Sequence, residues 1–441
     1  MKPSVLLISP AALDYHGVPI KKEKLYLPGL TLLSLAAVTP DDVELRLVNE
    51  PIESLPLDRQ WDLVGLTGMG SGLKRAWEVG DLFRARGSKV VIGGIAASLT
   101  PMEWSAPHAD SMVLGEADFT WPEVIDDFLA GRLKPCYPMG SRPDVASLPP
   151  PRYDLLSRGE KGLWRPVQAT RGCPFPCEFC SIQSFFERSY RKRPISHIIR
   201  DVRAAIATGS RYITFIDDNI GVDWKFFAEL MQALIPERII WASQCSIHIA
   251  DKPDMLKLAY QSGCRILSFG IESVNPASVA SVKKTFNQPA RFASLLGHVR
   301  ESGIAVSTEM IVGMEGDTED TFEHTYRFLM DNRIPLPRLY ILTPVPGTPM
   351  YRQFAEDGRI FNHDLANYNG GKCVFHPTGM SADVLQSNYW KLYERLYTYP
   401  AIARRMRGVP STMELTVRAF ILGTNLHYRN HVRERITPGI V

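Results

Sequence analysis

The sequence predicts an α/β protein with two parallel-sheet units in series, a doubly wound, Rossmann-like sheet followed by a βα barrel of the TIM type. Two observations predict this class. Short apolar runs alternate with amphipathic helical patterns along most of the chain, and a proline-rich stretch separates a first set of runs from a second set. The chain has 441 residues, enough for two or three domains. We expect the first sheet over residues 1–140, a linker over 141–160, the barrel over 161–360 and a small helical region over 361–441.

In the first unit, apolar runs at residues 5–9, 62–67, 89–94 and 111–114 read as buried parallel strands, and helical patterns lie at 30–38 and 73–86. The strand ends are rich in glycine, and ligands of such sheets bind at the carboxyl ends of the strands. Glycines there either let the backbone approach a large ligand or only form tight turns. Because the chain has no GxGxxG or Walker motif, a dinucleotide or a nucleoside triphosphate is not the favoured occupant.

The feature that dominates the chemistry is the stretch 171–180, which reads RGCPFPCEFC and places Cys173, Cys177 and Cys180 within eight residues. Two prolines disfavour a helix here, so we expect a loop that wraps a ligand. Three thiolates suit an iron–sulfur cluster with one open iron, whereas a structural zinc would need a fourth Cys or His at short range. A trio of buried or disulfide-bonded cysteines and a zinc site are the alternative interpretations.

The second unit repeats the strand and helix alternation as six βα pairs. We expect strands at 166–170, 212–216, 239–244, 266–270, 305–313 and 338–342, and helical patterns fill the gaps, for example at 195–208, 224–234, 253–261, 289–302 and 318–331. Polar residues follow several strands, above all Asp217, Asp218 and Asn219, whose oxygens could accept hydrogen bonds from an ammonium group. Helix capping is the alternative role for one of them.

Three further segments have a structural interpretation. The basic segment 188–193 reads as a solvated face, with an anion contact as the alternative. Aromatic residues between 389 and 397 fall at helical spacing, which favours a packing helix. The alternatives for the C-terminal region are an aromatic lid over a large apolar substrate, or attachment to the periphery of a membrane through the basic residues 429–435.

The composition excludes some classes. A net charge of +3 gives no basic stripe for nucleic acid, so we expect no nucleic-acid partner. The apolar run at 5–8 is too short for the core of a signal peptide, and no run approaches the length of a membrane span. Thiols that cluster as ligands suit a reducing compartment. We therefore expect a cytoplasmic protein.

The CxxxCxxC spacing, with Phe179 before the last cysteine, resembles the signature of the radical S-adenosylmethionine (SAM) enzymes. The first unit resembles the cobalamin-binding domain that precedes the radical SAM core in one large subfamily. It shares Pro28-Gly29-Leu30, a Gly-x-Thr strand end at 65–67, a Val-x-Gly-Gly strand end at 91–94 and a Gly-Glu-x-Asp segment at 115–118. The second unit resembles the partial (β/α)6 barrel of the same enzymes. The resemblance covers about residues 1–360, near the branch of hopanoid C-methylases and the anaerobic magnesium-protoporphyrin ester cyclase.

The resemblance implies three cofactors: a [4Fe–4S] cluster, S-adenosyl-L-methionine and cobalamin. It implies cluster ligation by Cys173, Cys177 and Cys180. It implies SAM binding by Phe179, Asp217, Asp218, Asn219, Gln244, Glu272 and Thr308. It implies cobalamin binding by Pro28, Leu30, Gly65, Thr67, Gly68, Gly93, Gly94, Gly115 and Glu116. The chain lacks the Asp-x-His-x-x-Gly motif, which implies cobalamin without a histidine on cobalt.

The implied activity is C-methylation of an unactivated carbon through a 5′-deoxyadenosyl radical and methylcobalamin. A cyclisation, rearrangement or oxidation with the same cofactors is the first alternative, and a non-catalytic cobalamin or redox sensor is the alternative of another class. The implied partners are a small-molecule substrate, large and apolar if the aromatic lid covers it, and an electron donor such as flavodoxin or ferredoxin. No catalytic side chain is assigned.

Overall fold

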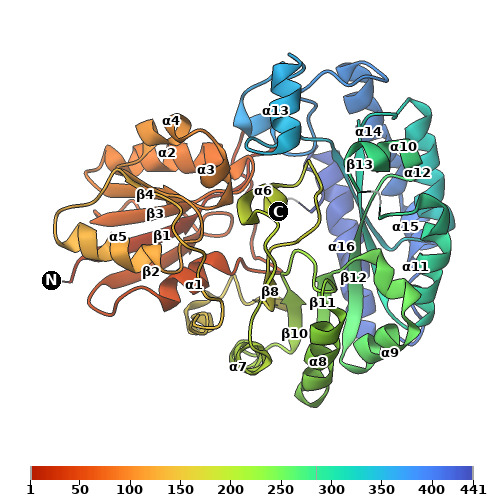
Figure 1. The fold of residues 1–441 in the computed structure, drawn as a ribbon, viewed down its shortest axis with the longest axis horizontal. Helices are drawn as coiled ribbons and strands as arrows, with labels where there is room; N and C mark the ends of the chain where they lie inside the picture. Colours follow the sequence, from red (N-terminus) through yellow and green to blue (C-terminus); the bar gives the residue numbers. More distant parts are fainter. Residues whose placement is uncertain (1, 285, 440–441) are drawn as a thin grey trace.

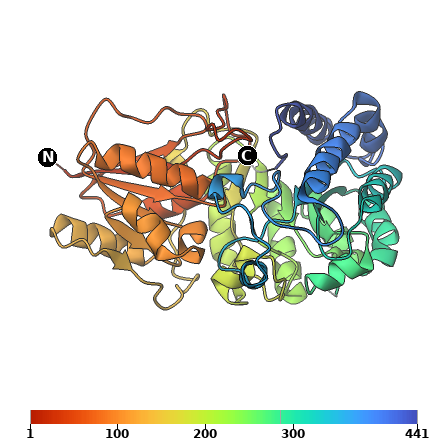
Figure 2. The same cartoon turned by 90° about the horizontal axis from the view of Figure 1, so that it is seen from above.

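The structure of the protein is a computed structural model that describes residues 2–284 and 286–439. Two parallel sheets, each of six strands in the described part of the chain, lie side by side, and helix α6 (Ser181–Phe186) lies between the two units (Figure 1). The second view shows the same separation of the N-terminal unit from the barrel (Figure 2). The predicted α/β class, with a Rossmann-like unit before a partial barrel and a helical C-terminal region, is confirmed.

The N-terminal sheet has the strand order β2-β1-β3-β4-β5-β6, so the order reverses between β1 and β3. Its strands are β1 (Ser4–Ser9), β2 (Glu44–Asn49), β3 (Leu63–Thr67), β4 (Lys89–Gly93), β5 (Ser111–Val113) and β6 (Cys136–Tyr137). Such a reversal opens a crevice at the carboxyl edge of the sheet. The sequence analysis missed the edge strands β2 and β6, because β2 alternates between exposed and half-buried residues and β6 is short.

Helices cover both faces of this sheet. Helices α1 (Thr31–Ala37) and α5 (Thr120–Leu129) pack on one face, while α2 (Gly72–Arg84) and α3 (Ile95–Leu99) pack on the other with the short α4 (Met102–Ser105) beside them. Both faces are therefore apolar, which explains the continuous apolar runs of β1, β3 and β4.

The barrel strands follow each other in chain order, β7-β10-β11-β12-β13-β14, and every pair is parallel. They span Trp164–Val167, Tyr212–Phe215, Ile240–Gln244, Cys264–Glu272, Ala305–Val312 and Leu336–Ile341. The helices after them are α7 (Ile195–Ile206), α8 (Trp224–Leu234), α9 (Pro253–Gln261), α10 (Pro276–Ser281), α11 (Phe292–Glu301), α12 (Asp320–Asp331) and α13 (Pro349–Glu356). Within the described residues β7 and β14 do not pair, so the barrel is open on one side.

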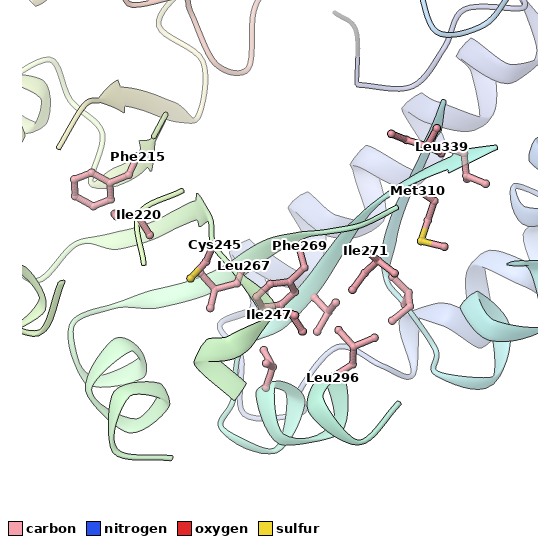
Figure 3. Packing of buried hydrophobic residues seen from close by; sticks show 14 of the residues in the cluster. Phe215, Ile220, Cys245, Ile247, Leu267, Phe269, Ile271, Leu296, Met310 and Leu339 are labelled. Carbon is pink, nitrogen blue, oxygen red and sulfur yellow. The ribbon is translucent and has the colours of Figure 1, made fainter. Parts of the chain in front are cut away.

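The main core lies between the barrel strands and the outer helices. Outward side chains of β12, such as Leu267, Phe269 and Ile271, meet Leu296 of α11 and Ile247 in a continuous apolar layer (Figure 3). Each such burial contributes about 1.5–3 kcal/mol. Several inward side chains of the barrel strands are small, for example Ser268 of β12 and Ser307 of β13, so the interior has space for a ligand.

Two C-terminal helices complete the barrel at different places. On α14 (Ala382–Leu396), the hydroxyls of Tyr389 and Tyr393 donate to the carbonyl of Leu339 at 3.1 and 2.9 Å, so α14 packs along the edge strand β14. The packing-helix interpretation is correct for α14. α15 (Tyr399–Met406) follows it, and α16 (Leu415–Arg433) packs against the inner side of the barrel through an apolar cluster that includes Trp164 and Leu336. Among the described residues, no helix is long and apolar enough to cross a bilayer.

Candidate active site

The three cysteines lie in a loop whose base is closed by two short antiparallel strands, β8 (Thr170–Arg171) and β9 (Arg191–Lys192). The loop begins at Gly172, which has a φ of +83°, and an added Cβ there would lie 2.2 Å from the carbonyl oxygen of Ser189. Only glycine fits that turn. The hairpin therefore holds the cysteine loop in a fixed position at the end of β7.

The cysteine side chains are free thiols in a largely buried environment. Burial raises the pKa of Cys173 to about 11 and that of Cys177 to about 12, and each thiol also responds to the charge of Cys180. In the described part of the chain, no three Cys, His, Asp or Glu side chains lie close enough together to hold a single metal ion. A cluster binds each cysteine through a different iron, so its ligands lie further apart than those around one ion. The donor set thus fits an iron–sulfur cluster.

A buried ion pair lies beside this loop. The ammonium of Lys284 donates to Glu272 at 2.5 Å and to the carbonyl of Gly270 at 2.9 Å, and its positive charge lowers the pKa of Cys177. Glu272 has a φ of +63°, a left-handed backbone that residues other than glycine rarely adopt. The sequence analysis singled out Glu272 but missed Lys284, because the pair forms only when the segment after α10 folds back onto β12.

The polar triplet after β10 binds backbone groups of neighbouring segments. Asp217 accepts hydrogen bonds from the amide and hydroxyl of Thr170 at 2.5 and 2.6 Å, and Asp218 accepts one from the amide of Gly172 at 3.1 Å. Asn219 accepts from the amide of Ser246 at 3.0 Å. Burial raises the pKa of Asp217 to about 7 and that of Asp218 to about 6. Asp217 and Asp218 therefore fix the start of the cysteine loop, and Asn219 fixes the segment after β11.

A first cavity of about 240 Å³ lies at the carboxyl edge of the N-terminal sheet, at the crevice that the strand order predicts. Of the residues assigned to cobalamin, the structure places the following at its wall: Leu30, Gly65, Thr67, Gly68, Gly93, Gly94, Gly115 and Glu116. Pro28 is buried before α1 and is not part of this wall. The sequence analysis missed Met69, which lines the cavity with 76% of its surface exposed.

Two of these glycines are also required by the backbone. Gly94 and Gly115 have φ values of +96° and +86°. A Cβ on Gly94 would lie 2.7 Å from the hydroxyl of Thr67, and one on Gly115 would lie 2.5 Å from Met139. The tight-turn interpretation is therefore correct for both, and both still face the cavity.

Ion pairs join the first cavity to the cysteine loop. Arg171 contacts Glu116 at 2.8 Å and Asp118 at 2.6 Å, and Arg191 contacts Glu116 at 2.6 Å. All four side chains are at most 19% exposed. The interpretation of 188–193 as a solvated face is therefore wrong for Arg191, and also for Arg193, which is buried against Asp201. Three basic residues of this segment, Arg191, Lys192 and Arg193, pair with acids from other elements, which the local charge pattern does not reveal.

A second cavity, of about 620 Å³, lies inside the barrel. Its wall consists of inward side chains of the strands, of α16 residues such as Phe420 and Tyr428, and of the segment 22–27 from the N-terminal unit. Asp217 and Gln244 line it at the carboxyl ends of β10 and β11. Ile216 lines both cavities, so the two spaces meet at the end of β10.

The remaining residues assigned to SAM are not part of the wall of this second cavity. Asp218, Asn219 and Glu272 are engaged as described above. Thr308 is fully buried, and among the described residues its hydroxyl has no hydrogen-bond partner. Phe179 is half-buried and packs against the barrel core.

Comparisons with known proteins agree with this geometry. The family model described as the Radical SAM superfamily matches residues 167–329. A bacteriochlorophyllide d C-12(1)-methyltransferase from Chlorobaculum tepidum is 30% identical over 390 residues, 86% of this chain and 85% of that protein. A bacteriochlorophyllide d C-8(2)-methyltransferase from the same organism is 28% identical over 420 residues, 91% of each chain. The solved structure of the radical SAM methyltransferase TsrM from Kitasatospora setae, with cobalamin and a [4Fe–4S] cluster bound, is similar in fold, with a TM-score of 0.66, 16% identity and coverage of 99% of this chain and 98% of that one.

Proposed function

The chain belongs to the radical SAM superfamily, in the branch with a cobalamin-binding N-terminal domain, and from this premise we propose that it is a C-methyltransferase acting on an unactivated carbon of a small molecule. One observation carries the proposal. The cavity at the edge of the N-terminal sheet and the cavity inside the barrel meet at Ile216, beside the cysteine loop. A methyl donor in the first cavity and a substrate in the second would face each other across that side chain.

The residues present fit the three cofactors. Cys173, Cys177 and Cys180 would hold the [4Fe–4S] cluster, Asp217 and Gln244 would contact SAM, and the glycine-lined first cavity would hold cobalamin. When bound, these groups supply a 5′-deoxyadenosyl radical and a transferable methyl group. No histidine lines the described wall of the first cavity, which supports a cobalamin without a histidine on cobalt.

The chain's own contribution is to position the cofactors and exclude water. Asp217 and Asp218 fix the start of the cysteine loop through Thr170 and Gly172, and Arg171 ties that loop to Glu116 at the first cavity. These contacts fix the position of one cavity relative to the other. A displacement of about 1 Å can cost on the order of 100-fold in rate, so this relative position matters for any transfer between the cavities.

The substrate class follows from the second cavity and the relatives. The two relatives described above are named as methyltransferases of bacteriochlorophyllide d, a tetrapyrrole. A cavity of about 620 Å³ whose wall includes Phe420, Leu336 and Ile266 suits a large apolar molecule. Tetrapyrroles are therefore the first class to test, with flavodoxin or ferredoxin as the electron donor.

A product assay tests the proposal. The chain is reconstituted without oxygen with iron, sulfide and hydroxocobalamin, then reduced in the presence of bacteriochlorophyllide d and SAM that carries a deuterated methyl group. We expect the label in the product, with one S-adenosylhomocysteine and one 5′-deoxyadenosine for each methyl group. 5′-Deoxyadenosine with an unlabelled, altered product would indicate a cyclisation or oxidation instead, and no SAM cleavage with any tetrapyrrole would contradict the proposal. The Cys173→Ala/Cys177→Ala/Cys180→Ala variant is the control.

A further inference from the structure

The wall of the barrel cavity carries two cations, Lys22 and Arg338, and only one of them is neutralised by the described residues. Arg338 forms an ion pair with Glu309 and donates to the hydroxyl of Ser268 at 3.0 Å. Lys22 forms no ion pair with any carboxylate of the described residues, although acids are nearly as frequent as bases in this chain. A lysine charge on a largely apolar wall is costly unless a counter-charge arrives.

Two histidines of α16 lie next to Lys22. His427 lines the cavity, and its ring centroid lies 4.0 Å from that of His431. His431 is 5% exposed, and its Nδ1 has no hydrogen-bond partner among the described residues. Burial lowers the pKa of Lys22 to about 8, and burial together with the charges of His427 and Lys22 lowers that of His431 to about 3. At neutral pH this group therefore offers one positive charge and neutral imidazoles.

The backbone fixes Lys22 in this position. The amide of Lys22 donates to the carbonyl of Pro51 at 2.7 Å, and the amide of Leu25 donates to that of Gly159 at 3.0 Å. The carbonyl of Tyr26 accepts from the amide of Trp164 at 3.0 Å, and the ring of Tyr26 packs edge-on to His427. Lys22 thus belongs to a preformed wall that spans the N-terminal unit and the barrel.

We propose that Lys22 and His427 bind a carboxylate of the substrate, so that the barrel cavity selects a large apolar molecule with an acidic side chain. This rests on the proposed function, because it names the substrate class of the same cavity. A single lysine charge matches a monoanion, and the imidazole of His427 can donate one hydrogen bond to its second oxygen. The acid would bind beside α16, leaving the apolar body to extend toward Ile216 and Gln244.

Equilibrium dialysis tests this with two probes that differ only in charge, 1-pyrenebutanoic acid and its methyl ester. The reconstituted full-length chain is used at pH 7.5 without SAM or reductant, so no chemistry is needed. We expect the acid to bind about tenfold more tightly than the ester, since hydrogen bonds to a charged group are worth about that much or more. In Lys22→Met the acid and the ester should bind about equally. In His427→Phe the acid should bind only about threefold more tightly than the ester.

Two controls keep the result specific. Lys22→Arg should restore the preference for the acid, and Lys24→Met, which removes an exposed lysine two residues away, should leave it unchanged. Equal binding of acid and ester by the unaltered chain would overturn the inference, as would the same preference in Lys22→Met. Preference for the acid without methylation of any tetrapyrrole would sustain the inference while contradicting the proposed function, so the two failures are distinguishable.

Discussion

Lys284 and Glu272 form a buried ion pair beside the cysteine loop, with side chains 13% and 6% exposed. Removing one member of such a pair leaves the other charge buried without a partner, which costs about 3–5 kcal/mol, whereas removing both costs much less. Glu272 also has a left-handed backbone, so the site already stores strain. The pair is therefore expected to matter for folding as well as for the cofactors.

The variant Lys284→Met should lower the free energy of unfolding by about 3 kcal/mol, because Glu272 loses its counter-charge. The double variant Lys284→Met/Glu272→Gln should recover at least half of that loss. Urea unfolding followed by circular dichroism measures both. Lys257→Met, which removes an exposed lysine of α9, is the control. A Lys284→Met protein as stable as the unaltered chain would show that the pair contributes nothing.

The affinity of the barrel cavity for a carboxylate should fall as the pH rises, because Lys22 then loses its charge. Burial lowers its pKa to about 8, and the groups that face it, His427 and His431, stay neutral above pH 7 because their pKa values are lowered too. Only protonated Lys22 attracts a carboxylate. The affinity for 1-pyrenebutanoic acid should therefore be nearly constant up to about pH 7, fall about twofold by pH 8 and fall about fivefold by pH 9.

The methyl ester serves as the internal control for this titration, because it carries no charge and its affinity should not change between pH 7.5 and 9.5. The Lys22→Met variant is the control for Asp217, which lines the same cavity and has a pKa of about 7, because a fall in acid affinity that persists in this variant would come from Asp217. An acid affinity that stays flat to pH 9.5 would rule out Lys22 as the partner.

At the scale of elements, α16 closes the open side of the barrel. Val417 and Ile421 pack in a cluster with Trp164 and Leu336, while Phe420, Gly423 and His427 line the cavity. The packing of this helix could not be predicted from the sequence, because its partners are strand residues about 80 to 250 positions earlier in the chain. Of the three uses considered for the C-terminal region, packing, a lid and membrane attachment, the structure shows packing, and α16 also forms part of the cavity wall.

Gly423 of α16 offers a direct test of the cavity. A Cβ added there meets no atom within 4 Å, and the residue lines the cavity. Gly423→Phe should therefore fold normally and gain up to about 0.5 kcal/mol from better helix propensity. The ring should occupy the cavity and weaken binding of 1-pyrenebutanoic acid at least about tenfold. Leu422→Phe, at an exposed position next to it, should bind like the unaltered chain. Equal binding by both variants would exclude this cavity as the substrate site.

At the scale of the whole molecule, features set by residues close together in the sequence could be predicted, whereas contacts between distant segments could not. The cysteine loop, the glycine-rich strand ends and the barrel repeat were predictable because each depends on residues close together in the sequence. The partners of Glu116, Glu272 and Lys22 were not, because Arg171, Lys284 and His427 reach them only after distant elements pack. The resemblance assigned Asp218 and Asn219 to SAM, and it gave no sign that both also accept hydrogen bonds from backbone amides in the fold.

An ion-pair network joins the two units by linking the first cavity to the cysteine loop. It consists of Arg171, Glu116, Asp118 and Arg191.

Ile216 lies where the two cavities meet and is 37% exposed. Substitutions of Ile216 therefore test the proposed methyl transfer between the cavities.

The most direct test is the ratio of methylated product to 5′-deoxyadenosine formed by Ile216→Trp under anaerobic turnover. A large ring at this junction should separate the cavities while leaving the cysteines and the glycine-lined wall intact. We predict that Ile216→Trp binds the [4Fe–4S] cluster and cobalamin and still forms 5′-deoxyadenosine. The amount of methylated product per 5′-deoxyadenosine should fall at least about tenfold, whereas Ile216→Val should keep the ratio of the unaltered chain. An unchanged ratio in Ile216→Trp would contradict transfer between the two cavities.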